Sequence, residues 1–234
     1  MLNVMDWGFL HHAIQRLIGQ RIWDAADGGD AGTLGSLLRH PKLTEADVNY
    51  SSVGQRDFPL WRAVDRGDLA CVRILLAHPL VDVNRRNVTG STVLHLACGK
   101  VSEANEVWVA IVRALCLRHD VELDVMDQDN CSPLWVACWH DGLQAVKLLL
   151  ACARVGGLDL ATRSRDKFRA VRTIPSGWDN LSAFQVATDT EIRELIIAYS
   201  QHPLSVRRSL RQEYGLLSRD IAFDFASTVL YSDG

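Results

Sequence analysis

Cysteine and histidine side chains are the residues of this chain that an enzyme or a metal site could use most directly. Cys138 and His140 are close enough in sequence to suggest a nucleophile and its base. Residues two apart on a helix point to different faces, however, so the two cannot form such a pair locally. A zinc site built from His95, Cys98 and Cys131 stays open as an alternative, although no ligand-pair spacing among them favours it.

Motifs of catalysis and phosphate binding are missing from the sequence. It contains no GxxxxGK[ST] phosphate loop, no GxGxxG after a strand, no GxSxG elbow and no HExxH. An enzyme would have to assemble its site from residues scattered along the chain. We therefore expect a non-catalytic protein with no cofactor, no catalytic residues and no metal ligands.

Composition narrows the class of partner. The 234 residues carry a formal net charge of −3, which gives no electrostatic reason to expect nucleic acid. No apolar stretch approaches the roughly 18 residues of a membrane span, and the N-terminus lacks the pattern of a signal peptide. We expect a monomer in the cytoplasm, with the nucleus as an alternative. The six cysteines then read as reduced thiols that pack as small hydrophobic residues.

Three short patterns recur along the chain in a fixed order. The first, Asp-Val-Asn, occupies residues 47–49 and 82–84, with weaker copies at 124–126 and 159–161. The second ends in alanine and reads Ile22-Trp23-Asp24-Ala25, Leu60-Trp61-Arg62-Ala63, Leu94-His95-Leu96-Ala97 and Leu134-Trp135-Val136-Ala137. The third is an apolar triplet spaced i, i+3, i+4, at Leu34/Leu37/Leu38, Val72/Leu75/Leu76, Val112/Leu115/Cys116 and Val146/Leu149/Leu150.

These patterns predict repeated units of two short helices. The small alanine of the first helix lets its antiparallel partner approach closely, and the apolar triplet of the second helix faces a neighbouring unit. Neither helix can bury its apolar face alone, so the units must stack. Asp-Val-Asn is expected to start a turn, because Asp and Asn side chains bond their own backbone.

The repeated segments resemble the ankyrin repeat. The family pattern D-x-x-G-x-T-P-L-H-x-A-A-x-x-G is similar to residues 87–98, NVTGSTVLHLAC, and to residues 127–138, DQDNCSPLWVAC. Asn130 stands where the pattern has its turn glycine, and asparagine is one of the few other residues that accept a left-handed backbone. His95 occupies the position of the pattern's histidine, where a hydrogen bond steadies the turn.

The resemblance implies an all-α solenoid of helix–turn–helix units with β-hairpin-like finger loops, capped by extra helices at both ends. We expect an N-terminal capping helix in residues 1–20, with Trp7, Leu10, Ile14 and Leu17 on its apolar face, and four repeats in residues 21–165. A basic finger follows in 166–177, then a degenerate terminal repeat in 178–200. Residues 201–234 read as capping or docking helices, with Val206, Leu210 and Tyr214 on one face.

The third unit is longer than its neighbours. Val112 lies 14 positions after Cys98, whereas Val146 lies only eight positions after Cys138. About six extra residues therefore fall within residues 99–111, where they lengthen the helix connection or the second helix. Insertions of this kind cost little stability and often carry function, although a neutral length variant is the alternative.

The resemblance also implies where a partner would bind, since fingers and first helices form the concave face of an ankyrin stack. Trp139 is the side chain we expect to matter most, because tryptophan is enriched in interface hot spots. Its alternative is packing against Trp108 or the insertion. Trp23, Trp61 and Trp135 are expected to be structural. The family's variable positions fall on Gln55, Asp57, Asp65, Arg66, Val88, Thr89, Ser91, Lys100, Gln128, Asp129, Cys131, Trp139 and His140.

The expected function is a scaffold or adaptor that binds another protein through the concave face. In the alternative, the stack is a spacer, and the C-terminal tail or the basic finger recruits a second protein. No residue in the sequence identifies that partner.

Overall fold

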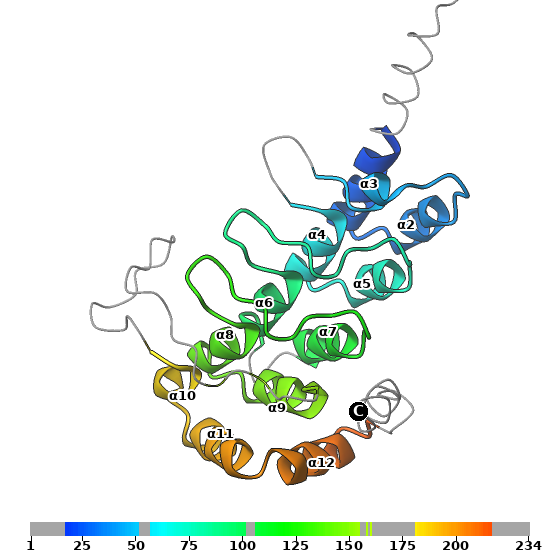
Figure 1. Cartoon of the computed structure of the whole chain (residues 1–234). Helices are drawn as coiled ribbons and strands as arrows, with labels where there is room; N and C mark the ends of the chain where they lie inside the picture. Colours follow the sequence, from blue (N-terminus) through cyan, green and yellow to red (C-terminus); the bar gives the residue numbers. More distant parts are fainter. Residues whose placement is uncertain are drawn as a thin grey trace, which may run out of the picture. The chain divides into compact units, whose positions relative to one another are not determined.

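The computed structural model describes residues 17–51, 57–101, 106–154, 158, 160 and 181–216. The chain divides into two compact units, Met1–Val88 and Thr89–Gly234. Helices joined by turns build both units, and the described residues include no extended β-strand (Figure 1). The all-α repeat architecture expected from the sequence is confirmed.

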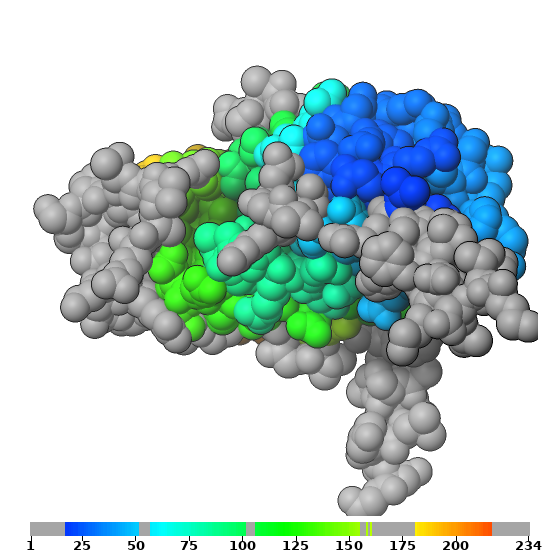
Figure 2. Space-filling model, turned by 90° about the horizontal axis from the view of Figure 1, so that it is seen from above, coloured from blue at the N-terminus to red at the C-terminus, as the bar shows by residue number. Residues whose placement is uncertain are grey.

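The first unit begins with a helix over residues 17–28, which runs across the boundary expected at residue 20 and contains the first Trp-Asp-Ala pattern. Residues 1–16, with most of the expected capping helix, lie outside the described residues. Figure 2 shows residues 17–50, in blue, packed closely together. The helices that follow are α2 (Ala31–Leu38), α3 (Glu45–Val48), α4 (Pro59–Asp65) and α5 (Leu69–Leu76).

The second unit contains two rows of helices (Figure 1). One row is formed where α8 packs on α6 and α10, and the other where α9 packs on α7 and α11. Apolar residues of the predicted triplets fill the space between the rows and are fully buried, as at Val112 and Leu149. The helices are α6 (Val93–Cys98), α7 (Glu106–Cys116), α8 (Pro133–Trp139), α9 (Leu143–Cys152), α10 (Ala183–Val186), α11 (Thr190–Gln201) and α12 (Pro203–Glu213).

Three of the described helix pairs share one turn geometry. Gly29, Gly67 and Asp141 adopt left-handed backbones there, with φ of 73°, 71° and 49°. Glycine accepts such a φ without steric cost, and aspartate tolerates it better than most residues. The next N–H of each turn donates to the alanine of the second sequence pattern: Asp30 to Ala25 (2.9 Å), Asp68 to Ala63 (3.0 Å) and Gly142 to Ala137 (2.9 Å).

The fingers that lead into α6 and α8 contain the predicted turns. Gly90 has a φ of 76°, and Asn130, in place of glycine, has a φ of 59°. The Asp127 N–H donates to the Cys131 carbonyl (3.0 Å), and the Asp127 carboxylate accepts from the N–H groups of Asp129 and Cys131 (both 2.9 Å). The finger before α8 is therefore a turn closed by such bonds, and the described residues of both fingers include no strand.

The first Asp-Val-Asn pattern does more than start a turn, which corrects the sequence interpretation. Asp47 and Val48 end the one-turn helix α3. The Asp47 carboxylate accepts from the Thr44 N–H (2.8 Å), and the Thr44 hydroxyl accepts from the Asp47 N–H (3.4 Å). This reciprocal capping satisfies backbone donors at the start of the helix, so a helix competes successfully with the open turn that we expected.

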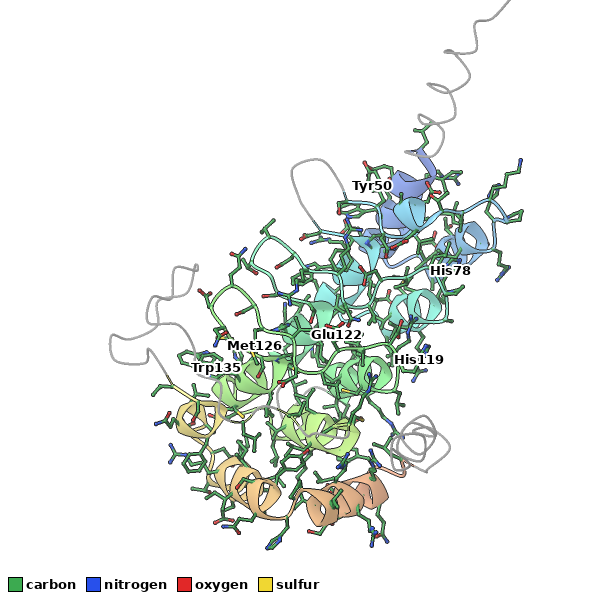
Figure 3. The ribbon with its side chains drawn as sticks, in the orientation of Figure 1. Tyr50, His78, His119, Glu122, Met126 and Trp135 are labelled. Atoms are coloured by element: carbon green, nitrogen blue, oxygen red, sulfur yellow. The ribbon has the colours of Figure 1, made fainter. Side chains whose placement is uncertain are left out.

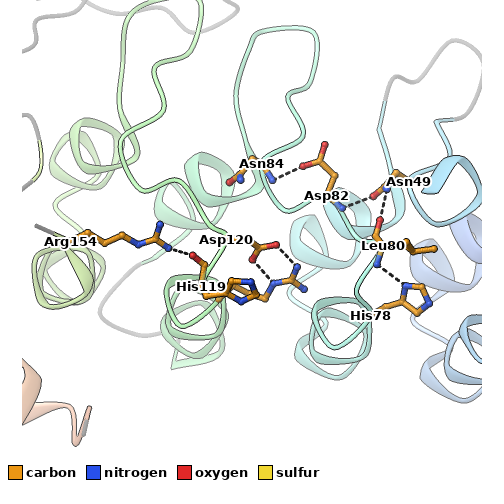
Figure 4. Close-up of polar contacts among 9 residues, drawn as sticks. Asn49, His78, Leu80, Asp82, Asn84, His119, Asp120 and Arg154 are labelled. Atoms are coloured by element: carbon orange, nitrogen blue, oxygen red, sulfur yellow. Dashed lines mark hydrogen bonds and ion pairs between the residues drawn. The ribbon is translucent and has the colours of Figure 1, made fainter. Parts of the chain in front are cut away.

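Asn49, directly after α3, joins two loops of the first unit (Figure 4). Its amide donates to the Leu80 carbonyl (2.8 Å), and its side-chain oxygen accepts from the Asp82 N–H (2.9 Å). The second Asp-Val-Asn copy behaves as predicted, because the Asp82 carboxylate accepts from the Asn84 N–H (3.0 Å) and forms an Asx turn. The same three-residue pattern therefore ends a helix in its first copy and forms a turn in its second.

The insertion of the third repeat is divided between its connection and its helix. Three residues separate α4 from α5 and α8 from α9, whereas seven, residues 99–105, separate α6 from α7. Helix α7 has 11 residues, compared with eight in α5. Both alternatives offered by the sequence thus apply, although residues 102–105 lie outside the described part of the chain.

Helix α12 is fastened to the C-terminal end of α9. Arg207 is 8% exposed and donates from Nη1 to the Ala153 carbonyl (2.7 Å). Arg211 donates from Nε to the Ala151 carbonyl (2.8 Å). Carbonyls at a helix C-terminus lack partners within the helix and carry partial negative charge, which the two guanidinium groups satisfy. The face occupied by Leu210, which is buried, is therefore engaged within the unit.

Replacing Arg207 with methionine is expected to lower the free energy of unfolding by about 1–3 kcal/mol, because the Ala153 carbonyl loses its charged donor. Urea denaturation followed by circular dichroism measures the change, and hydrogen exchange should quicken in α12. Arg208→Met is the matched control, since Arg208 is exposed on the same helix. Equal losses for the two variants would show that the Arg207 bond does not hold α12.

Candidate functional site

Cys138 and His140 do not form a catalytic pair. Cys138 is fully buried in α8, and burial raises the pKa of its thiol to about 12. His140 follows the last residue of the same helix and is partly exposed. A thiol with so high a pKa carries almost no thiolate at neutral pH, so Cys138 offers no nucleophile.

His95 holds its own turn and the finger of the next repeat. Its Nδ1 accepts from the Thr92 N–H (3.1 Å), and its Nε2 lies 3.0 Å from the Cys131 carbonyl, to which it donates. With both ring nitrogens engaged, the imidazole is structural, as expected for the histidine of the pattern. No group of three or more His, Cys, Asp or Glu side chains within the described residues is arranged to hold a metal ion.

Two tryptophans at the same pattern position make the equivalent bond. The Trp23 indole N–H donates to the Asp57 carbonyl (3.1 Å). The indole N–H of Trp135, labelled in Figure 3, donates to the Leu181 carbonyl (2.8 Å). Each carbonyl, like that of Cys131, belongs to the residue just before the N-cap of the next repeat's first helix. Trp135 and Trp23 are therefore structural residues, as expected. Their indole N–H groups bond each one to the backbone of the next repeat.

Arg62 organises the candidate residues of the first unit. Its guanidinium lies 2.5 Å from the Asp27 carboxylate, 3.7 Å from that of Asp57 and 3.6 Å from that of Asp65. It also lies over the Trp23 ring, 5.7 Å from the centroid. Burial, together with the nearby Asp65 and Asp27 carboxylates, raises the pKa of Asp57 despite Arg62. Sequence reasoning missed Arg62 because its nearest carboxylate partner, Asp27, lies 35 positions away, although Asp65 is only three residues after it on α4.

The other candidates in the first unit differ in their surroundings. Arg66 is exposed directly after α4, and Val88 is 45% exposed in a finger. Gln55 lies outside the described residues. Asp57 and Asp65 are thus held by Arg62, while Arg66 and Val88 present more of their surface to solvent.

The finger residues of the second unit lie close together. One of them, Cys131, is buried and not exposed as expected. The Gln128 N–H donates to the Thr89 carbonyl (3.0 Å), and the Thr89 hydroxyl lies 3.1 Å from that of Ser91. Gln128 is exposed and Asp129 half-buried. Cys131, in contrast, is 1% exposed, and its thiol donates to the Asp129 carbonyl (3.7 Å) within the finger. The placement of Cys131 on the binding face was therefore wrong.

Trp139 packs on Trp135, not on Trp108. The two rings, four residues apart on α8, lie 5.4 Å apart between centroids with an interplanar angle of 11°. Trp135 is 4% exposed, whereas Trp139 remains partly exposed. The alternative that Trp139 packs against Trp108 is therefore not what the structure shows. A partly exposed aromatic ring is thus held in place by a buried one.

Trp108 has a different partner. The Lys100 ammonium lies over the Trp108 ring, 5.7 Å from its centroid. Lys100 follows α6 and Trp108 lies on α7, so the contact spans the insertion. A cation over an aromatic ring contributes about 0.5–1 kcal/mol at an exposed site. This contact restrains Lys100. It could not be predicted from the sequence, which shows only that both residues are present.

Lys100, Trp139 and His140 come from neighbouring helix ends. A Cβ added to Gly99 would lie 3.5 Å from the His140 Nε2 and 3.3 Å from the Val136 side chain, so the end of α6 directly adjoins α8. Lys100 follows Gly99, and Trp139 precedes His140. We call Thr89, Ser91, Lys100, Gln128, Asp129, Trp139 and His140 the inner row of the second unit.

The segments named in the alternative function are only partly described. The basic finger, residues 166–177, and the end of the tail, residues 217–234, lie outside the described residues. The part of the tail that is described, α12, is bonded to α9. No described helix is long and apolar enough to cross a membrane.

Comparison with known proteins identifies the repeats independently. A family model described as ankyrin repeats (3 copies) matches residues 60–163. Those residues run from the second residue of α4 to beyond the end of α9. No curated protein matches the chain.

Proposed function

Because the chain is an ankyrin-repeat protein, we propose that it is a non-catalytic scaffold or adaptor that binds another protein through the inner row of its second unit. Ankyrin repeats are generally protein–protein interaction modules. The observation that carries the proposal is the partly exposed Trp139 ring, stacked on the buried Trp135. We place the protein in the cytoplasm as a monomer.

Stacking prepares Trp139 for binding. Association costs free energy when a free side chain must be ordered at the interface, about 0.5–1.5 kcal/mol for each one with many rotamers. Trp139 is already restrained by Trp135, which in turn is bonded to the Leu181 carbonyl. The exposed part of the indole is therefore apolar surface with little of that cost remaining, as expected of a hot spot.

The other residues of the inner row are polar. His140 follows Trp139, Lys100 follows the end of α6 that adjoins α8, and Gln128 and Asp129 belong to the finger that leads into α8. An apolar centre with a polar rim is typical of protein interfaces. Charges of both signs in the rim favour a partner segment that is itself mixed rather than strongly acidic or basic.

Trp139→Ala tests the proposal. Proteins captured by the wild type from cell extract should be identified first, and their affinities then measured with purified components. We expect Trp139→Ala to weaken the relevant partner about 30-fold, corresponding to a hot spot of about 2 kcal/mol. Val107→Ala is the matched control, because Val107 is an apolar side chain 42% exposed on α7, outside the inner row.

Two results would contradict the inner-row proposal. In one, folded Trp139→Ala binds as tightly as the wild type. In the other, deletion of residues 217–234 abolishes binding while Trp139→Ala retains it, which would favour the docking tail. The deletion begins after α12, because removing Arg207 and Arg211 would disturb α9 as well.

A further inference from the structure

The helix pair α10 and α11 exposes positions that the corresponding earlier helices bury. The second residue after the N-cap is a leucine at most 2% exposed in α4, α6 and α8, but in α10 it is Phe184, which is 38% exposed. The fourth and eighth residues after the N-cap are apolar and at most 8% exposed in α2, α5 and α9. In α11 they are Arg193, which is exposed, and Ile197, which is 42% exposed. A terminal repeat needs a polar outer face to stay soluble, so apolar residues at these positions indicate a surface that binds another element.

Phe184, Arg193 and Ile197 form one continuous patch, which we call the end face. The Arg193 guanidinium lies over the Phe184 ring, 6.0 Å from its centroid. Arg193 and Ile197 are four residues apart on α11 and so lie on the same side of the helix. The Arg193 Nε donates to the Ala187 carbonyl (2.7 Å), which holds the cation beside these apolar side chains. No carboxylate of the described residues forms an ion pair with Arg193, so a partner can supply one.

The described chain ends away from the end face. The Tyr214 carbonyl, directly after α12, accepts from Arg113 of α7 (3.1 Å). Leu216, the last residue that the structure describes, is buried. Helix α9 packs on both α7 and α11, so the end of the described chain lies beside α7 rather than beside α10 (Figure 1). This direction favours an occupant of the end face from outside the chain.

A second copy of the chain fits the end face poorly. In a two-fold dimer the same patch meets itself, and residues near the axis face their own copies. Arg193 would then lie against a second Arg193, and like charges placed together across an interface cost free energy. A different partner that places a carboxylate there gains a charge-assisted hydrogen bond instead.

We propose that the end face is a second docking surface, which binds an amphipathic helix of a partner protein. The helix places apolar side chains on Phe184 and Ile197 and a carboxylate on Arg193. Amphipathic helices bind apolar surfaces through residues spaced i, i+3 and i+4, and helices are also the elements that cover one another within a repeat stack. The end face is built by α10 and α11, whereas the inner row is built by α6, α8 and their fingers. Binding at the end face therefore does not depend on binding at the inner row.

Selection from a library of helical peptides tests the end face. Amphipathic peptides about 18 residues long, displayed on phage, are selected on the full chain, and synthetic copies of the enriched ones are titrated against it. We expect enriched peptides to carry Asp or Glu among their apolar residues. Ile197→Asp should weaken their binding about 30-fold, and Arg193→Met about tenfold, because an apolar contact or the charged bond is lost. Val107→Asp is the matched control, since Val107 is also apolar and 42% exposed, but on α7.

The remaining results each support or overturn the proposal. Unchanged affinity in Trp139→Ala would support it, because that variant alters the inner row alone. Peptides that bind Ile197→Asp as tightly as the wild type, or enriched peptides without a carboxylate, would overturn it. So would binding that appears only after deletion of residues 217–234, which would show that the tail covers the end face. A dimer in analytical ultracentrifugation that Ile197→Asp dissociates would assign the face to a second copy instead.

Discussion

Replacing Trp135 with alanine is expected to lower the free energy of unfolding by about 3–5 kcal/mol, the usual cost of removing a buried tryptophan. The indole is 4% exposed, and its N–H donates to the Leu181 carbonyl before α10. It also supports the stacked ring of Trp139. The loss should therefore loosen the contact of α8 with α10 and release Trp139. Urea denaturation followed by circular dichroism measures the free energy.

Two controls separate the contributions at this position. Trp135→Phe keeps an aromatic ring but removes the indole N–H, so we expect a smaller loss, about 1–2 kcal/mol. Trp139→Ala removes the partly exposed member of the pair and should cost less than Trp135→Ala. If Trp135→Ala and Trp139→Ala destabilise the protein equally, the division into a supporting ring and a presenting ring is wrong.

Spacing predicted the repeat because each helix pair needs the same few residue types. Alanine at residues 25, 63 and 137 accepts the bond that closes its turn, and the triplets supply the buried stripe. Gly90 and Asn130 take the left-handed backbone that the finger requires. These requirements are local, so they are visible in the order of residues along the chain.

Contacts between repeats were less predictable, because they depend on residues 34 to 46 positions away. Trp23, His95 and Trp135 were recognised as equivalent, but the carbonyl that each one reaches is visible only in three dimensions. Asn49 similarly looked like a turn residue, and instead joins the loop at Leu80. A sequence pattern identifies the donor of such a bond more readily than its acceptor.

The candidate site was predicted in part for the same reason. The pattern predicted that Lys100, Trp139 and His140 share one face, and the structure shows that the ends of α6 and α8, which precede or contain them, adjoin at Gly99 and His140. The pattern could not distinguish exposed from buried positions within a finger. Cys131 is buried there, and its carbonyl accepts from the His95 ring. The ring that packs against Trp139 depends on the direction of its side chain. Residues four apart on a helix lie on the same face, so Trp139 stacks on Trp135.

His95→Ala is expected to lower the free energy of unfolding by about 3–4 kcal/mol. The substitution creates a cavity, leaves the buried Thr92 N–H without its acceptor, and removes one of the two donors to the Cys131 carbonyl, which keeps the Asp127 N–H. The imidazole is 3% exposed and joins the Thr92 N–H to the Cys131 carbonyl. Its removal therefore weakens both the start of α6 and the finger of the next repeat. Urea denaturation measures the loss, and hydrogen exchange at Thr92 and Cys131 locates it.

His95→Gln separates the two bonds, because glutamine already occupies the equivalent position of α10. Gln185 stands at the equivalent position of α10, where its side-chain oxygen accepts from the Ser182 N–H (3.0 Å). Glutamine at residue 95 should therefore preserve the cap on Thr92 but not the bond to Cys131, and we expect about half of the alanine loss. Hydrogen exchange should then quicken at the finger while Thr92 stays protected. Equal losses for alanine and glutamine would instead assign the whole effect of His95 to the contact between repeats.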